Sequence, residues 1–279
     1  RLGDEEETFD FARGIEVHKV GQLAAQPNIE VLTMSELVEL KGTAGAFTAT
    51  IRQRTRYVTD ACTQCRHCHT VCPQVAPNQF QAGVTVRKAI YTPFRGAFPQ
   101  PYVIDIETCL NNPPNYMPCQ RCVEVCDDNA IHFEMPPNQK LTREVGAVVL
   151  ATGFSVEGSG ELEKFGYVSH PDILTFMELE QLISPAGPSG GFVEKLSNSS
   201  SPENVLYVIH DAGRFACGCA AAQCDKMIDQ EIKNVVVLHP PTTKEGDAFG
   251  AFWRSVAKRT VTLVEAELEQ ITPTEDEQL

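Results

Sequence analysis

Two groups of four cysteines lie in the first half of the chain, and their spacing is the strongest chemical signal in the sequence. The first group, with the spacing C-x2-C-x2-C-x3-C-P, runs from Cys62 to Pro73. The second, with the spacing C-x9-C-x2-C-x3-C, ends at Cys126 and carries Asp127 where the first group has its proline. The first spacing is typical of bacterial ferredoxins, in which the thiolates bind 4Fe–4S clusters.

Cysteines spaced in this way bind their clusters in a crossed manner. Three close cysteines of one group surround one cluster, and the fourth reaches the cluster of the other group. The first predicted 4Fe–4S site therefore consists of Cys62, Cys65, Cys68 and Cys126. The second consists of Cys109, Cys119, Cys122 and Cys72. We expect His67 and His69, which lie between ligands, to face solvent or to stand just outside the ligand shell.

The alternative for these eight thiols is a pair of structural zinc sites. Zinc also takes four thiolates, but usually from two separate C-x2–4-C pairs, and the triple C-x2-C-x2-C is not such an arrangement. If zinc were bound nevertheless, the chain would be an interaction scaffold stabilised by zinc and without redox activity, which is the alternative function. Two iron–sulfur clusters in one small fold would instead pass single electrons. The sequence shows no nucleophilic triad or acid–base pair of the kind that catalyses the making or breaking of covalent bonds.

A third set of metal-binding residue types lies in "VIHDAGRFACGCAAAQCDK", namely His210, Cys217, Cys219 and Cys224. Three thiols and an imidazole this close together could bind a metal. Cysteine is also a common small residue of helices buried against a sheet. The spacing does not decide between the two interpretations.

Composition restricts the remaining function classes. The chain has 279 residues and a formal net charge of −14, which argues against nucleic acid and anionic lipid as partners. No apolar run reaches the 18 residues of a membrane span, so we expect no membrane insertion. The 11 cysteines are clustered, hydrophobic residues make up 42% of the chain, and no export signal is visible. These features favour metal binding in a reducing compartment, the cytoplasm.

The elements that must position these residues follow two different patterns. Residues 28–53 predict a strand and a hairpin, whereas 57–136 have little periodicity and need metal ligation to become ordered. A buried strand is expected from Gly146 to Ala151, ending in the turn Ala151-Thr152-Gly153, where backbone could approach a ligand. The remaining expected elements are helices at 172–184, 219–231 and 247–259 and strands at 204–210, 234–239 and 260–271. Their alternation predicts a parallel, Rossmann-like α/β sheet.

Several stretches together resemble the A-type iron–sulfur subunit of heterodisulfide reductase. They include "PNIEVLTMSELVELKG", "RYVTDACTQCRHCHTVCPQVAPNQF", "RKAIYTPFRGAFPQPYVIDIETCL", "CQRCVEVCDDNAI", "GAVVLATGF" and "LEQLISPAGPSGG". The resemblance covers most of the chain. The block "VRKAIYTPF" is its most specific part, because a generic ferredoxin has no reason to carry it.

This resemblance implies a thioredoxin-reductase-like flavoprotein with an inserted module of two 4Fe–4S clusters. The implied domains are 1–56, part of the flavoprotein α/β domain; 57–136, the ferredoxin insert; and 137–279, the α/β domain continued. It implies that FAD binds near Ala151, Thr152 and Gly153 and that the chain has partner subunits in a multi-subunit redox complex. Some members of the family split an electron pair at the flavin. Related complexes interact with quinones or reduce benzoyl-CoA, and they are the alternative within the same class.

The sequence departs from the family pattern at three places. The glycine-rich FAD fingerprint corresponds to a stretch upstream of Arg1. Either the chain is a fragment whose N-terminal half carries it, or another polypeptide supplies it, or FAD is not bound. The family has a four-cysteine cluster site in its C-terminal region, where this chain has His210 and altered spacing of Cys217, Cys219 and Cys224. That set could hold a third 4Fe–4S cluster or have lost it. Many members continue into a further ferredoxin module, whereas this sequence ends at Leu279.

Overall fold

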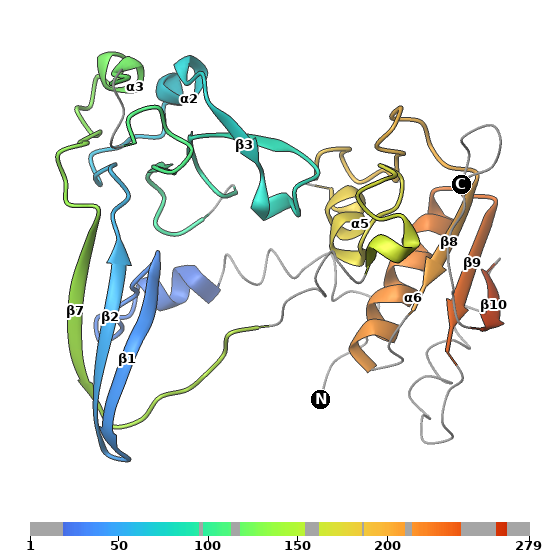
Figure 1. The fold of residues 1–279 in the computed structure, drawn as a ribbon, viewed down its shortest axis with the longest axis horizontal. Helices are drawn as coiled ribbons and strands as arrows, with labels where there is room; N and C mark the ends of the chain where they lie inside the picture. Colours follow the sequence, from blue (N-terminus) through green and yellow to red (C-terminus); the bar gives the residue numbers. More distant parts are fainter. Residues whose placement is uncertain are drawn as a thin grey trace. The chain divides into compact units, whose positions relative to one another are not determined.

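The computed structural model describes residues 19–94, 97–112, 118–153, 162–185, 187–209, 214–240 and 261–266, without the side chains of 214–217. The chain divides into two compact units (Figure 1). One is formed by Asp10–Phe80 with Val86–Gly153, and the other mainly by Phe154–Leu279. We call them the cysteine-rich unit and the C-terminal unit. Among the described residues, no helix is both long enough and apolar enough to cross a membrane.

An antiparallel sheet with the strand order β1-β2-β7 forms one end of the cysteine-rich unit. Strands β1 (Ser35–Thr43) and β2 (Ala46–Arg54) make the predicted hairpin. Its turn needs glycine at position 42, since the φ angle is +105° and a Cβ there would lie 2.1 Å from the carbonyl oxygen of Ala46. Strand β7 (Asn138–Val145) pairs with β2, so that Arg54 faces Asn138. The chain therefore leaves this sheet after β2 and returns to it at β7.

The excursion between β2 and β7 contains only short elements. The two helices are α2 (His67–Val71) and α3 (Arg121–Glu124), and one 3-10 turn lies at η2 (Gln79–Gln81). The strands are β3 (Val75–Pro77), β4 (Val86–Lys88), β5 (Ile90–Tyr91) and β6 (Val103–Ile104). Strand β3 pairs with β4 and β5 with β6, both antiparallel. An antiparallel bridge between Val58 and Ile131 joins the two ends of the excursion.

The core of this region is apolar and includes cysteines. Its buried members are Tyr57, Val58, Cys68, Ile90, Tyr102, Ile104, Cys122, Ala130 and Ile131. Five further cysteines are half-buried. Four of them, all except Cys119, pack against these buried core residues. Seven of the eight thiols are therefore buried or half-buried in this region, and Cys65 is exposed.

The predicted strand from Gly146 to Ala151 is wrong. Strand β7 ends at Val145, and the residues that follow have no strand conformation. Val149 is 88% exposed and Leu150 79% exposed, although an apolar run of this kind predicts burial. The reason is that a strand needs hydrogen-bonded neighbours, and the described residues provide none for this segment.

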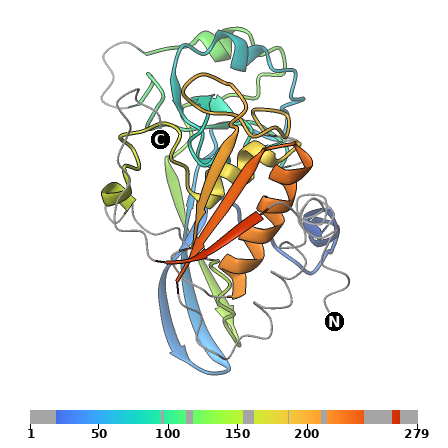
Figure 2. The same cartoon turned by 90° about the vertical axis from the view of Figure 1, so that its right-hand side faces the viewer.

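The described residues of the C-terminal unit form a parallel sheet and two regular helices. Strands β8 (Asn204–Val208), β9 (Asn234–His239) and β10 (Val261–Glu265) lie in the order β10-β9-β8, all parallel. Helix α6 (Arg214–Asp229) connects β8 to β9 and crosses one face of the sheet (Figure 2). Helix α5 (Phe176–Ile183) packs against α6, and η3 (Glu163–Phe165) precedes it. The predicted strand–helix–strand pattern is confirmed over 204–239, but α6 begins five residues earlier than expected.

The core of the C-terminal unit lies between α6 and the sheet. Its most buried side chains are Ala220, Cys224, Met227, Val235 and Val237, each at most 1% exposed. The expected helix at 247–259 and the residues after 266 lie outside the described part of the chain.

Candidate metal centres

The loop of the first cysteine group wraps tightly before α2 begins. Gln64 and Arg66 both have positive φ angles, 62° and 72°, which non-glycine residues seldom adopt. The side chain of Thr63 donates to Asp128 at 2.6 Å, and its backbone N–H reaches the same oxygen at 3.2 Å. These two bonds tie the first loop to the residues that follow Cys126.

One hollow lies inside this loop. Its thiol-bearing lining residues are Cys62, Cys65, Cys68 and Cys126. Apolar residues, among them Val58, Ile90 and Ile131, form most of the rest. This is the same set of four cysteines that the crossed spacing predicts for the first cluster.

A second hollow lies on the other side of Ile90, a residue that lines both. Its thiol-bearing lining residues are Cys72, Cys109, Cys119 and Cys122. The structure thus brings the eight cysteines together in two sets of four, divided as the crossed spacing predicts. Their ligation of a cluster stays a prediction.

Burial makes these thiols hard to ionise in the absence of a cation. It raises the pKa of Cys68 to about 11 and that of Cys122 to about 12, and it also raises the pKa of Cys109. Metal binding requires thiolates and releases these protons. Two backbone N–H groups donate to sulfur: Asn111 to Cys109 Sγ and Ala130 to Cys126 Sγ, each at 3.4 Å. Such bonds stabilise a thiolate and influence the potential of a bound cluster.

The thiols of each set stand apart around a space. A zinc site would gather four sulfurs about 2.3 Å from one ion. Within the described residues, no group of three or more His, Cys, Asp or Glu side chains is arranged to hold a single metal ion. The ten cysteines whose side chains are described form no disulfide.

Neither histidine of the first group lines a hollow. His67 is exposed, while His69 is half-buried beside the ring of Tyr102, with a centroid distance of 6.5 Å. Burial lowers the pKa of His69, so its neutral form is favoured. Both positions agree with the expectation that the histidines are not ligands.

Only part of the third predicted set can be located. His210 and the side chain of Cys217 lie outside the described residues. Cys219 and Cys224 are on α6 and are 4% and 0% exposed. Burial raises the pKa of Cys219 to about 11 and that of Cys224 to about 12. These two thiols occupy core positions of a helix packed against a sheet, and a third cluster stays a prediction.

The predicted flavin contact is exposed. Ala151, Thr152 and Gly153 lie in an irregular, exposed segment, and Gly153 has a φ angle of +70°. Their backbone groups are accessible, and neither of the two hollows extends to them.

Sequence reasoning missed a buried ion pair near the second hollow. Arg87 and Asp105 meet at 2.8 Å, and their side chains are 10% and 21% exposed. The signal that could have found it is the charged pair Arg87-Lys88 at the start of the otherwise apolar stretch "AIY".

No protein-family model matches the chain, but curated proteins do. The chain is 35% identical over 202 residues to the A-type iron–sulfur subunit of CoB–CoM heterodisulfide reductase from Methanocaldococcus jannaschii, covering 72% of this chain and 30% of that protein. One of the corresponding iron–sulfur subunits from Methanopyrus kandleri is 38% identical over 75% of this chain and 30% of its own length. The A-type subunit of the H2:CoB–CoM heterodisulfide,ferredoxin reductase of Methanothermobacter thermautotrophicus is 33% identical over 75% of this chain and 31% of its length. The matched part thus spans about a third of each relative.

Proposed function

The chain belongs to the family of A-type iron–sulfur subunits of heterodisulfide reductase, and we propose that it is the cluster-bearing part of an oxidoreductase subunit that relays electrons. The observation that carries this proposal is the division of eight cysteines into two sets of four, each around its own hollow. Each hollow would hold one 4Fe–4S cluster. A cluster of this kind takes up and releases one electron at a time.

The residues around the hollows suit such a group. Four sulfur donors surround each space, and thiolates are the ordinary ligands of iron–sulfur clusters. Val58, Ile131 and Ile104 exclude water from the sulfurs, and the N–H groups of Asn111 and Ala130 stabilise two of the thiolates. Ile90 separates the hollows by a single side chain, which keeps the two proposed clusters close enough for electrons to pass between them.

The first hollow would exchange electrons with the outside. Cys65 and its neighbours Gln64 and Arg66 are exposed, whereas none of the four cysteines of the second hollow is exposed. A cluster near the surface is the natural contact for a partner, because electron transfer weakens with distance. We propose that this partner is another member of a multi-subunit complex in the cytoplasm.

FAD is the second cofactor that we propose, at the other end of the relay. It is supported by the family resemblance, by the accessible backbone of Ala151–Gly153 and by the parallel β8-β9-β10 sheet with α6, which suits a Rossmann-like domain. A flavin exchanges electron pairs with substrates and single electrons with clusters. The glycine-rich phosphate-binding fingerprint does not occur in these 279 residues, so we assign it to a further part of the flavoprotein. We further propose, from the family resemblance alone, that this flavin splits an electron pair.

Metal and flavin analysis of anaerobically purified protein tests the proposal. We expect about eight irons per chain, a brown colour and no stoichiometric zinc. Zinc without iron would overturn the proposal in favour of a structural scaffold. FAD released on denaturation of the full-length protein would support the flavin, and its absence there would remove the flavin from the relay.

The variant Cys65→Ser tests the ligand assignment. It should lose the first cluster, so that iron falls to about half, and slow electron transfer to an external acceptor. The matched control is His67→Ala, in the same loop but outside both hollows, which should keep all its iron. Equal iron content in Cys65→Ser and wild type would contradict the assignment.

A further inference from the structure

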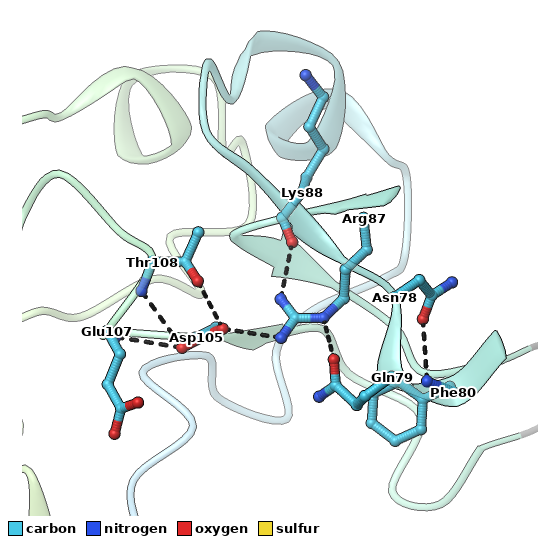
Figure 3. A network of polar contacts seen from close by, with 8 residues as sticks. All are labelled: Asn78, Gln79, Phe80, Arg87, Lys88, Asp105, Glu107 and Thr108. Atoms are coloured by element: carbon cyan, nitrogen blue, oxygen red, sulfur yellow. Dashed lines mark hydrogen bonds and ion pairs between the residues drawn. The ribbon is translucent and has the colours of Figure 1, made fainter. Parts of the chain in front are cut away.

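Arg87 makes an unusually complete set of contacts for a residue outside both hollows (Figure 3). Its guanidinium donates to the side-chain oxygen of Gln79 at 2.7 Å, to Asp105 Oδ2 at 2.8 Å and to the carbonyl oxygen of Lys88 at 3.3 Å. It also lies over the ring of Tyr91, 4.1 Å from the centroid. These contacts fix the guanidinium in one place within the cysteine-rich unit.

Asp105, the acidic partner, organises the turn that leads to Cys109. Its Oδ1 accepts from the backbone N–H of Glu107 at 3.2 Å and from that of Thr108 at 3.4 Å. Its Oδ2 accepts from the Thr108 hydroxyl at 2.8 Å, and its carbonyl oxygen accepts from the N–H of Cys109 at 3.0 Å. Burial pushes the pKa of Asp105 upward, but the bonds from Arg87 and Thr108 outweigh it, so the pKa lies below its usual value.

A continuous series of backbone hydrogen bonds joins this turn to the other end of the second set. The N–H of Asp105 donates to the carbonyl of Ala89 at 2.8 Å, and the N–H of Ala89 donates to the carbonyl of Gln74 at 3.2 Å. Gln74 follows Cys72 by two residues. Ala89 and Gln74 both line the second hollow. Backbone bonds of Ala89, two residues after Arg87, thus join the two segments that bring Cys72 and Cys109 to the same space, and Arg87 adds its side-chain bond to Asp105 in one of them.

Cys109 needs such support more than the other cysteines do. The first group places its cysteines two or three residues apart, so each ligand is held by its neighbours along the chain. Nine residues separate Cys109 from Cys119, and 113–117 lie outside the described part of the structure. Asp105, four residues before it, instead holds Cys109 through the hydrogen-bonded turn of residues 105–109.

We propose that Arg87 and Asp105 are positioning residues that hold Cys109 at the second hollow and decide whether a complete cluster forms there. This inference rests on the proposed function, since it assigns a role toward the second cluster. Arg87 and Asp105 do not line either hollow. They act through the turn of residues 105–109.

The substitutions Arg87→Met, Arg87→Lys and Asp105→Asn separate the contributions of shape and charge. Arg87→Met removes every polar contact, and we expect occupancy of the second cluster to fall by about twofold or more. Lysine keeps the charge but is a single point donor that cannot reach three oxygens in a plane, so Arg87→Lys should be intermediate. Asp105→Asn keeps one acceptor oxygen for the backbone N–H groups of the turn but loses the charge that faces Arg87, and it should also be intermediate.

The readout must distinguish a positioning role from general damage. Iron content reports how many clusters remain, and the electron paramagnetic resonance spectrum, compared with the spectra of Cys65→Ser and Cys122→Ala, reports which of the two is affected. A cluster that has lost one cysteine gives a three-iron signal after oxidation. We expect this signal, or loss of the cluster, from the second site only, while the first cluster keeps its spectrum and potential.

Two further variants act as controls. Arg143 also binds a carboxylate with two bonds, to Glu30 at 2.6 and 2.9 Å, but it lies on the β1-β2-β7 sheet. The variant Arg143→Met should therefore keep all its iron. The double variant Arg87→Met/Asp105→Asn removes both charges. If the single variant suffers only because a buried charge is left unpaired, the double variant regains the second cluster, and the positioning role is overturned.

The other possible outcomes would overturn either this inference or the proposed function. Unchanged iron and an unchanged spectrum in Arg87→Met would overturn the inference, and so would equal loss of both clusters in Arg87→Lys and Asp105→Asn. Wild-type protein without iron would overturn the proposed function before any variant is measured. If the wild-type protein has about eight irons and Arg87→Met keeps all of them, this inference is overturned and the proposed function stands.

Discussion

Cysteines are buried in both units of the chain, but different kinds of backbone carry them. In the cysteine-rich unit they sit on loops and on helices of five and four residues, with left-handed residues between them. In the C-terminal unit Cys219 and Cys224 sit on a regular helix of 16 residues that packs against a sheet. A loop can direct several thiols toward one space, whereas a helix distributes them around its axis. A buried thiol on such a helix packs in the core as a small apolar group. Backbone shape therefore distinguishes the proposed ligands from Cys219 and Cys224 where burial does not.

Removal of iron should separate the two units most clearly. Isolated helices of four or five residues are not stable by themselves, so we expect residues 57–136 to lose their order when the clusters are removed. Helix α6 and strand β9 pack in an apolar core and should remain folded. Hydrogen exchange measured by mass spectrometry, before and after anaerobic chelation, tests this. Protected amides in α2 and α3 after complete iron loss would remove the contrast between the units.

Replacing one buried cysteine in each unit gives the next largest difference. Cys122→Ala should lose the second cluster and about half of the iron. Cys224→Ala should keep all of the iron and cost about 1 kcal/mol of the unfolding free energy, the ordinary effect of a core substitution. Iron analysis and urea unfolding of both variants measure the contrast. If Cys224→Ala loses about four irons, α6 carries ligands, and a third cluster replaces the core interpretation.

A polar residue in the C-terminal core gives a smaller effect on stability alone. Gln223 is 1% exposed; it accepts from the Tyr207 hydroxyl at 2.9 Å and donates to the Phe176 carbonyl at 3.0 Å and to Glu180 at 2.9 Å. Gln223→Leu removes three hydrogen bonds to partly buried groups, which should cost about 1–3 kcal/mol.

The control for this substitution is Gln139→Leu, because Gln139 bonds Gln53 at an exposed position. Its unfolding free energy should change by less than about 0.5 kcal/mol. Thermal unfolding of the two variants checks the difference, and both should keep their iron. Loss of iron in Gln223→Leu would mean that the C-terminal core and the cysteine-rich unit are coupled.

The success of sequence reasoning also differs between the units. The crossed division of the cysteines follows from local spacing, because each set combines three near neighbours with one cysteine of the other group. The hairpin of β1 and β2 and the strands β8 and β9 were likewise visible as apolar runs bounded by glycine or polar residues. Such features depend on residues close together in sequence.

What the sequence could not show depends on distant partners. The run Gly146–Ala151 has the composition of a buried strand, but Val149 and Leu150 are exposed because the described residues supply no strand to pair with. The pair of Arg87 and Asp105 spans 18 residues, and only the folded β4, β5 and β6 bring its members together. Composition cannot reveal a contact whose partner is chosen by tertiary structure.

The helix start at Thr175 allows the smallest test of the same contrast. Thr175 Oγ1 accepts from the N–H of Glu178 at 3.3 Å, and Glu178 Oε2 accepts from the N–H of Thr175 at 2.6 Å, which is a complete capping box. Helices α2 and α3 have no side-chain cap. Thr175→Ala should therefore cost about 1 kcal/mol, measured by urea unfolding, while Thr175→Ser should cost little because it keeps the oxygen. If Thr175→Ala has no measurable cost, packing alone determines α5, and the difference in capping between α5 and the helices α2 and α3 has no consequence for stability.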